Sequence, residues 1–342
     1  MSMNTKILLD RSFFIEQKKE IVVNKEFKIN IFKYKSGVEA IEVENSRGAF
    51  IVLPYMGQMI WRASFDGIDL TMKNMFSQPR KTNNMLDTYG CFAFHSGLLA
   101  NGCPGPDDTH AMHGEFCCAE LDEAWIELAD DEVIIKGQYE YCQGFGYKYV
   151  ARPSVSLKSN DTKIKIGMYV KNLTSIEMPL QYMCHINYNY VDEGQFSANI
   201  PDKAFKLRES IPSHIHPTPN WYAYTDEIKE MQKSGKTLDK LGDTRLYDPE
   251  IVFLADDLAQ YAEDIYVEIK SPKGYAFCTQ FASKDFNYGT RWIMYNGDQQ
   301  VSSCIIPGTC RPEGFLAAKK AGSLISLKPQ EEKTFEVYTG LK

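Results

Sequence analysis

The 342-residue chain has no surplus of basic residues. It carries 38 Lys and Arg against 45 Asp and Glu, which gives a formal net charge of −7, and the basic residues are scattered. A protein that binds the phosphate backbone of a nucleic acid is expected to carry a basic patch or stripe. The composition therefore argues against nucleic acid as a partner.

Long apolar runs are also missing. The best run, residues 49–53, is five residues long, whereas a membrane-spanning helix needs about 20 apolar residues. Charged side chains interrupt the first twenty residues, so this segment cannot supply the apolar core of a secretory signal. We therefore expect no membrane partner, no export signal and a cytoplasmic location.

The cysteines show none of the spacings that are typical of disulfide frameworks or redox motifs. There are nine, an odd number, and they include the adjacent pair Cys117 and Cys118 but no C-x-x-C. Such a set fits free thiols in a reducing compartment. We expect these residues to be small members of the core.

Recognisable metal and nucleotide motifs are likewise absent. Cys103, His110, His113 and Cys117 have ligand-type side chains close in sequence, but their spacing matches no established zinc pattern. The chain contains no H-E-x-x-H, no G-x-S-x-G nucleophile elbow and no phosphate-binding P-loop. We therefore expect no metal and no cofactor.

Strand-like patterns dominate the sequence. Phe27, Ile29 and Ile31 alternate with polar residues, and residues 125–128 and 133–136 flank a four-residue polar turn that predicts a hairpin. Residues 155–158 and 163–170 repeat this arrangement. The 20 Tyr and 19 Phe suit strands as well. The pattern predicts an all-β protein built from antiparallel strands.

The remaining segments do not indicate a domain boundary. An imperfect apolar stripe predicts one helix over residues 226–241, and residues 76–111 are rich in Gly and Pro and therefore in loop. Long structured loops are usually functional. Because all-β sandwiches often exceed 200 residues as one unit, and no linker or internal repeat is visible, we predict a single domain over residues 1–342.

His185 lies in a strand-like run with two different faces. Period-two geometry sends Tyr182, Cys184 and Ile186 to one face, while His185 and Asn187 share the other face with further amides. An imidazole beside neutral amides suits the binding of hydroxyl groups in a polar cleft. The alternative is a solvated outer face.

Two more segments carry polar side chains that suit a site. His113 and Glu115 follow the Gly- and Pro-rich loop, and Arg311 and Glu313 follow the apolar run at residues 305–306. The second segment is punctuated by Pro and Gly, so it could direct a carboxylate into a cleft. The alternative for this second segment is a surface loop with a solvated glutamate.

Three short motifs occur in the order of a known superfamily. Residues 170–175 lead through Pro179 to the His185 strand, residues 112–114 read Met-His-Gly, and residues 325–331 read Ile-Ser-Leu-Lys-Pro-Gln-Glu. These motifs resemble, respectively, the active-site histidine strand, the second histidine and the final turn of the aldose 1-epimerase (galactose mutarotase-like) superfamily. The likeness extends over residues 113–342.

The resemblance implies a β-supersandwich of large antiparallel sheets that holds a sugar on a concave face without metal or nucleotide. His185 would be the general acid that protonates the ring oxygen. His113 and Asn187 would hold hydroxyl groups, and Trp292 could stack on the sugar.

The chain departs from the family pattern at two points. Ile306 stands where the family has its catalytic glutamate, so Glu313 is the provisional base and Glu115 is another carboxylate near the site. The family's substrate arginine is also missing before His113. Three other arginines would have to replace it, and any of them in the cleft would indicate an anionic sugar: Arg80, Arg291 and Arg311.

Two functions fit these patterns. The first is an aldose 1-epimerase-like isomerase that interconverts sugar anomers by acid–base ring opening and closure, with His185 and Glu313 as the acid–base pair. The second is a non-catalytic protein on the same fold that binds or senses a carbohydrate. In both cases the partner is a small sugar or sugar derivative, its identity is open, and the protein is a monomer or a homodimer.

Overall fold

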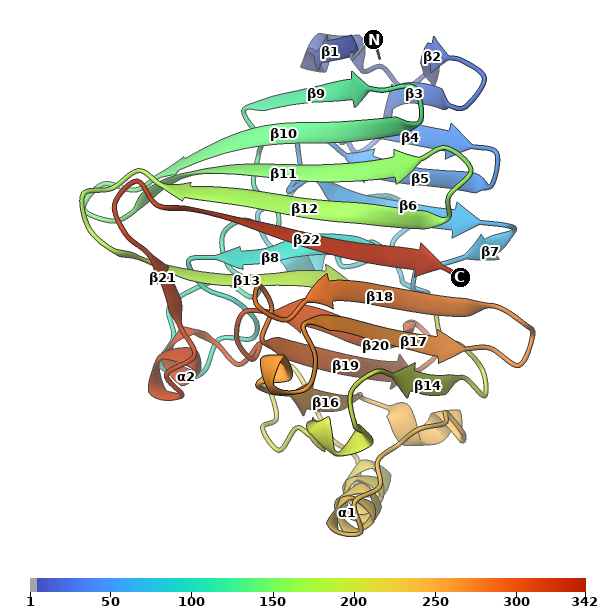
Figure 1. The fold of residues 1–342 in the computed structure, drawn as a ribbon, viewed down its shortest axis with the longest axis vertical. Helices are drawn as coiled ribbons and strands as arrows, with labels where there is room; N and C mark the ends of the chain where they lie inside the picture. Colours follow the sequence, from blue (N-terminus) through green and yellow to red (C-terminus); the bar gives the residue numbers. More distant parts are fainter. Residues whose placement is uncertain (1–4) are drawn as a thin grey trace.

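The computed structural model describes residues 5–342 and has two large antiparallel sheets that pack face to face (Figure 1). The first sheet lies in front in this view. In spatial order its strands are β1 (Thr5–Leu9), β9 (Glu123–Leu128), β10 (Glu132–Cys142), β11 (Lys148–Lys158), β12 (Lys163–Asn172), β22 (Glu332–Leu341), β18 (Ala276–Ala282), β17 (Asp264–Lys270) and β14 (Gln195–Ala198).

The second sheet is longer and contains the strand of His185. In spatial order its strands are β15 (Phe205–Leu207), β16 (Ile251–Ala255), β19 (Tyr288–Tyr295), β20 (Gln300–Gly308), β13 (Met178–Ile186), β8 (Ala93–Leu98), β6 (Met59–Phe65), β5 (Gly48–Leu53), β4 (Glu39–Asn45), β3 (Lys28–Lys33) and β2 (Lys19–Val23). Two short strands lie beside this path: β7 (Ile68–Asp69) pairs with β6, and β21 (Ile325–Leu327) pairs with β13.

The two predicted hairpins are present. Strands β9 and β10 pair antiparallel with Leu128 opposite Val133, and β11 and β12 pair with Leu157 opposite Ile164. Along β12 the apolar residues at every second position are buried, as a sheet with one covered face requires. The all-β prediction is confirmed.

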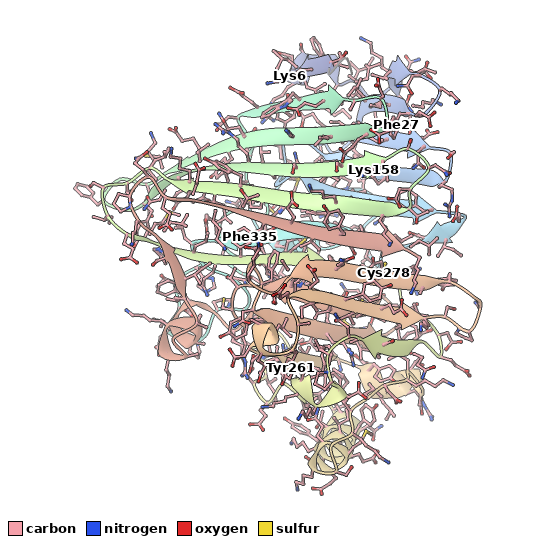
Figure 2. All side chains as sticks on the ribbon, viewed as in Figure 1. Lys6, Phe27, Lys158, Tyr261, Cys278 and Phe335 are labelled. Atoms are coloured by element: carbon pink, nitrogen blue, oxygen red, sulfur yellow. The ribbon has the colours of Figure 1, made fainter. Side chains whose placement is uncertain are left out.

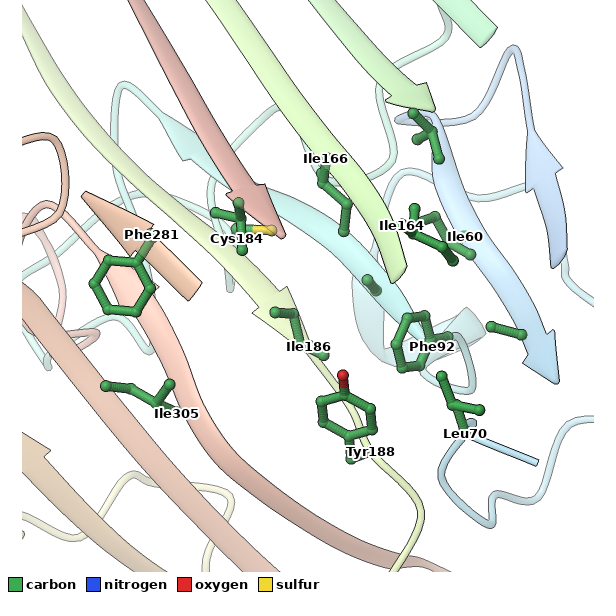
Figure 3. Packing of buried hydrophobic residues seen from close by; sticks show 14 of the residues in the cluster. Ile60, Leu70, Phe92, Ile164, Ile166, Cys184, Ile186, Tyr188, Phe281 and Ile305 are labelled. Carbon is green, nitrogen blue, oxygen red and sulfur yellow. The ribbon is translucent and has the colours of Figure 1, made fainter. Parts of the chain in front are cut away.

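The main core fills the space between the sheets. Figure 3 shows Cys184 and Ile186 of β13, and Tyr188 just beyond it, at every second position of the chain. Their side chains are directed into this core together with those of Ile166 of β12 and Phe92. All five residues are buried. Because successive side chains of a strand alternate, this arrangement directs His185 to the opposite face of the second sheet.

One buried side chain ties the two sheets together. The hydroxyl of Tyr188, just beyond β13, lies 2.9 Å from the carbonyl oxygen of Cys278 and 2.6 Å from Oγ1 of Thr339. Both partners belong to the first sheet. Figure 2 shows the side chains on the ribbon and labels Cys278. The single-domain organisation remains a prediction, which this shared core supports.

The observed helix is displaced from the prediction. Helix α1 spans Pro219–Lys233 rather than residues 226–241. Thr218 caps its start through a hydrogen bond from the backbone N–H of Trp221, and Pro219 occupies the first helical position, where its missing N–H costs nothing. Gly235, with φ of +79°, follows the end of the helix. Because glycine at this position is typical of a helix terminus, the stripe beyond it was misleading.

The Gly- and Pro-rich stretch contains more structure than predicted. It includes β8 and the 3-10 turn η2 (Met85–Thr88), and β8 runs beside β13 with Phe94 opposite His185. The remaining helical pieces are α2 (Phe315–Lys320), η1 (Arg11–Phe13), η3 (Asp202–Ala204), η4 (Thr244–Tyr247) and η5 (Leu258–Gln260). Strand β8 escaped notice because all six of its residues are buried, which removes the alternation that marks a half-exposed strand.

Within residues 5–342, no helix combines the length and apolar character that crossing a membrane would require. All nine cysteines are free, and seven of them are buried.

Candidate active site

A cleft of about 360 Å³ opens on the face of the second sheet that is turned away from the core. Small-molecule sites commonly have volumes of about 300–1,000 Å³. Strands β13, β16, β19 and β20 contribute to its walls, as do the loops before β8 and β16. Among the polar and aromatic side chains that line it are Tyr89, His113, His185, Arg208, His214, Glu250 and Trp292.

The orientation of His185 is fixed on two sides. Its ring stacks on that of Phe94, with centroids 4.6 Å apart and planes 14° from parallel. Its Nδ1 lies 2.7 Å from Oδ1 of Asn187, whose Nδ2 donates to the carbonyl oxygen of Cys91 at 2.9 Å. Because that carbonyl can only accept, the amide must present its oxygen to the imidazole. Nδ1 of His185 therefore carries the proton.

The other ring nitrogen of His185 points to the cleft as an acceptor. Its Nε2 lies 3.3 Å from the hydroxyl of Tyr89, which can donate to it. Burial lowers the pKa of His185 to about 3, while the hydrogen bond with Asn187 acts in the opposite direction. The imidazole is therefore neutral, and its Nε2 is a hydrogen-bond acceptor on the side of the cleft.

His113 reaches the same place from an unusual backbone turn. Its φ is +63°, and Gly114 follows with φ of +77°. A Cβ atom on Gly114 would lie 2.1 Å from the carbonyl oxygen of Ala100, so only glycine fits there. Nδ1 of His113 lies 3.0 Å from Oγ of Ser96, and its ring centroid lies 5.0 Å from that of His185. Burial lowers its pKa as well.

Glu250 supplies a carboxylate to the cleft. It directly precedes β16 and is 7% exposed. Its Oε1 accepts a hydrogen bond from Nη2 of Arg208 at 2.5 Å, and its Oε2 accepts one from Nε1 of Trp292 at 2.7 Å. The ring of Trp292 in turn lies 5.6 Å from that of His185. The carboxylate of Glu250 is therefore held in place, and the ring of Trp292 lies between it and the imidazole of His185.

The sequence analysis did not identify Glu250, Arg208 or Tyr89. Glu250 follows Pro249 and precedes five buried apolar residues. A charged residue at the start of a fully buried strand is the one sequence feature that could have indicated it. Arg208 directly follows the short strand β15, in which only the first and last residues are buried. Tyr89 lies in the loop-rich stretch, where no periodicity marks it.

The position at which the family has its base is apolar and faces the cleft. Ile306 is buried and lines the cleft. It belongs to a compact apolar cluster that also lines the cleft through Met183, Val252, Trp292 and Met294. The side chain of Ile306 therefore offers the cleft no proton acceptor, although Glu250 lies beside the same cluster through its hydrogen bond with Trp292.

Glu313 and Arg311 are not among the residues that line the cleft. A carboxylate oxygen of Glu313 accepts a hydrogen bond from Ser210, and its Oε2 lies 3.7 Å from Nη1 of Arg311. Nε of Arg311 donates to Asp256 at 2.8 Å. Only Pro312, between them, lines the cleft, because these two side chains are bound to partners elsewhere. Glu250 is the carboxylate that lines the cleft, and Glu313 does not line it.

The side chain of Arg291 lies on the face of β19 that is turned away from the cleft. It is 2% exposed, with its guanidinium 4.0 Å from the ring centroid of Phe196 and 3.9 Å from that of Phe205. Its Nη1 donates to the carbonyl oxygen of Leu238 at 3.1 Å. The neighbouring Trp292 faces the cleft, so strand alternation sends Arg291 into the core. The expectation that it contacts a sugar is revised.

Arg80 and Glu115 also lie outside the cleft lining. Arg80 is exposed beside a pocket that adjoins the cleft and shares Met75, Phe76 and Leu86 with it, but Arg80 does not line the cleft itself. Oε1 of Glu115 accepts hydrogen bonds from the backbone N–H groups of Leu98 and Leu99, each at 3.0 Å, and from the hydroxyl of Tyr149 at 2.8 Å. With three donors already bound, this carboxylate supports the end of β8.

The four ligand-type residues between Cys103 and Cys117 do not assemble. In the part of the chain that the structure describes, no group of three or more His, Cys, Asp or Glu side chains could hold a metal ion. Nδ1 of His110, for example, lies 2.7 Å from the backbone oxygen of Ala111.

Solved structures share this architecture over nearly the whole chain. A candidate aldose 1-epimerase from Klebsiella pneumoniae superposes with a TM-score of 0.80 at 15% identity, covering 100% of this chain and 91% of that one. Galactose mutarotase-like proteins from Clostridium acetobutylicum (TM-score 0.61, 16% identity, 93% and 99% covered) and Lactobacillus casei (0.60, 13%, 89% and 100%) are also similar. These likenesses establish the fold. The chain therefore has the galactose mutarotase-like β-sandwich fold that the sequence predicted.

Within this class, the chain belongs to the family described as Domain of unknown function (DUF4432), whose sequence pattern matches residues 35–341. No curated protein matches the sequence.

Proposed function

We propose that the protein is an aldose 1-epimerase-like isomerase that interconverts the anomers of an aldose bound in the cleft. One observation carries the proposal. A buried carboxylate, Glu250, and two buried imidazoles, His113 and His185, converge on one cleft, with Trp292 in contact with both Glu250 and His185. The likeness of the fold to mutarotase-like proteins supports this assignment.

The chemistry assigns complementary roles to the two ends of this arrangement. Glu250 accepts the proton of the anomeric hydroxyl, and His185 donates a proton from Nε2 to the ring oxygen, so that the C1–O5 bond breaks. Rotation about C1–C2 and closure return both protons and give the other anomer. His113 and Asn187 are proposed to contribute to substrate binding, with Asn187 acting through its hydrogen bond to His185. Trp292 offers an apolar face to the sugar.

The hydrogen bonds place a condition on this mechanism. Nε2 of His185 carries no proton, because Nδ1 carries it. The acid role therefore requires an imidazolium that is one proton richer than the resting state. Arg208 and Trp292 together hold Glu250 as an acceptor by each donating a hydrogen bond to it.

The decisive test is the rate of anomer exchange, measured by magnetisation-transfer NMR on a panel of aldohexoses, aldopentoses and their deoxy derivatives. We expect acceleration over buffer for at least one sugar and its loss in Glu250→Gln and in His185→Gln. Glu313→Gln is the matched control, because that carboxylate is bound outside the cleft lining. No acceleration for any aldose would contradict the proposal.

The second hypothesis, a non-catalytic protein that binds or senses a carbohydrate, is favoured by a single observation. Ile306 places hydrocarbon where the family has its base. Saturable sugar binding by calorimetry, without any acceleration of anomer exchange, would select this function.

A further inference from the structure

Hydrocarbon forms a continuous part of the cleft wall. Ile306 of β20, Val252 of β16, and Trp292 and Met294 of β19 belong to one buried cluster and all line the cleft. Val252 and Trp292 are direct cross-strand partners. The cluster is separate from the main core, which contains the neighbouring Ile305. It therefore belongs to the site.

The hydrogen-bonding capacity of this wall is small. Thr290 is the cross-strand partner of Ile306 and also lines the cleft, so its hydroxyl is the polar group nearest in the sheet. Trp292 directs its only donor, Nε1, to Glu250. A sugar hydroxyl placed against Ile306 and Val252 would lose water without gaining a partner.

The charges of the cleft are already paired. Arg208 is bound to Glu250, which is buried, and the Arg208 side chain itself is only partly exposed. The three arginines that could indicate an anionic sugar, Arg80, Arg291 and Arg311, are outside the lining. A phosphate or carboxylate on the substrate would therefore find no uncommitted guanidinium among the lining residues.

We propose that the preferred substrate is an uncharged deoxy-aldose, which places its deoxygenated carbon against the wall formed by Ile306 and Val252. The inference rests on the proposed function in one respect, namely that the cleft holds a sugar. A methyl or methylene group in this position gains apolar contact, whereas a hydroxyl is desolvated without a partner. Discrimination of about tenfold or more between a deoxysugar and its parent follows from these two effects.

The test is a set of calorimetric dissociation constants for pairs that differ by one hydroxyl: D-fucose with D-galactose, L-rhamnose with L-mannose, and 2-deoxy-D-ribose with D-ribose. We expect at least one deoxysugar to bind about tenfold more tightly than its parent. In Ile306→Thr, which adds a hydroxyl to the wall, this preference is expected to fall below about threefold. Val252→Thr is a second variant with the same expected direction.

Thr290→Val supplies the matched control, because it removes the nearest hydroxyl and should leave the deoxysugar preference intact or increase it. Equal or tighter binding of the parent in every pair, or a preference that both wall variants leave unchanged, would overturn the inference. Anomer exchange separates it from the proposed function. A deoxysugar preference without exchange overturns only the isomerase, exchange without the preference overturns only the inference, and failure to bind any sugar overturns both.

Discussion

Nε1 of Trp292 donates a hydrogen bond of 2.7 Å to Oε2 of Glu250. The sequence had indicated Trp292 as a site residue, but it had not indicated Glu250. The bond also means that the only cleft-lining carboxylate among the described residues is approached by an indole on one side and by the guanidinium of Arg208 on the other. The carboxylate is thereby fixed in place before any sugar arrives.

Glu250→Gln is expected to lower kcat by roughly 10²–10⁴-fold, the usual effect of losing one acid–base group. The amide keeps the shape of the side chain but cannot accept a proton. Anomer-exchange rates measure the effect. If Glu313→Gln lost comparable activity while Glu250→Gln kept it, Glu313 rather than Glu250 would have to be the base.

The dependence of rate on pH reports the protonation of His185. Burial lowers its pKa in the free protein to about 3, and kcat/KM follows the free enzyme. If His185 is the acid, kcat/KM should fall about tenfold per unit as pH rises between roughly 6 and 8. His113, His214, Glu250 and Tyr89 face the same cleft, so the profile is to be repeated in His113→Gln and in His214→Gln. A flat profile would instead make neutral His185 the proton acceptor.

Asn187 is expected to act by positioning the imidazole. Asn187→Leu removes the acceptor for Nδ1 of His185 and frees the ring to carry its proton on Nε2. We expect kcat to fall about tenfold or more with a smaller change in KM. The ¹⁵N chemical shifts of His185 should report the Nδ1–H tautomer in the wild type and a mixture in the variant. Unchanged shifts would show that Asn187 does not set the tautomer.

Acid should destabilise the protein through His95, a buried histidine that lies outside the cleft. His95 is buried beside Tyr182, and burial lowers its pKa to about 3. The unfolded state binds a proton near pH 6.5, so this contribution to stability is present above that pH and is lost as pH falls toward 3. Between pH 7.5 and 5 we expect His95 to account for about 2 kcal/mol of the lost free energy of unfolding. Denaturant titrations of the wild type and His95→Gln at both pH values measure the difference, and equal losses would contradict it.

Tyr188→Phe removes a hydroxyl that joins the sheets. Its partners, the carbonyl of Cys278 and the hydroxyl of Thr339, remain buried. We expect the free energy of unfolding to fall by about 1–3 kcal/mol. Urea denaturation measures it, and sugar affinity should stay unchanged because the hydroxyl faces away from the cleft. A loss of affinity without a loss of stability would contradict this view of the core.

Much of the fold follows from the sequence because strand alternation is a local property. The hairpin between β9 and β10 and the two faces of β13 were both readable from period-two patterns. The same rule, applied to β19, would have placed Arg291 opposite Trp292 and so in the core. The sequence analysis considered Arg291 only for its charge, as one of three arginines that could replace the family's missing substrate arginine.

Other parts of the site depend on contacts that no local pattern records. Glu250 and His185 are 65 positions apart in the sequence, and they meet because β16 and β13 belong to one sheet with β19 and β20 between them. Glu313 was the more attractive carboxylate because it lies close to Ile306 along the chain. Its bonds to Ser210 and Arg311 are visible only in the folded molecule.

The alternation along β13 has a consequence for how this protein can be studied. Pairing this strand one residue out of register would exchange every side chain between its two faces, turning the imidazole into the main core and Cys184 and Ile186 toward the cleft. Any function that depends on the placement of His185 would be lost in such a molecule. Activity after refolding therefore depends on the fraction of molecules in which β13 has paired in the correct register.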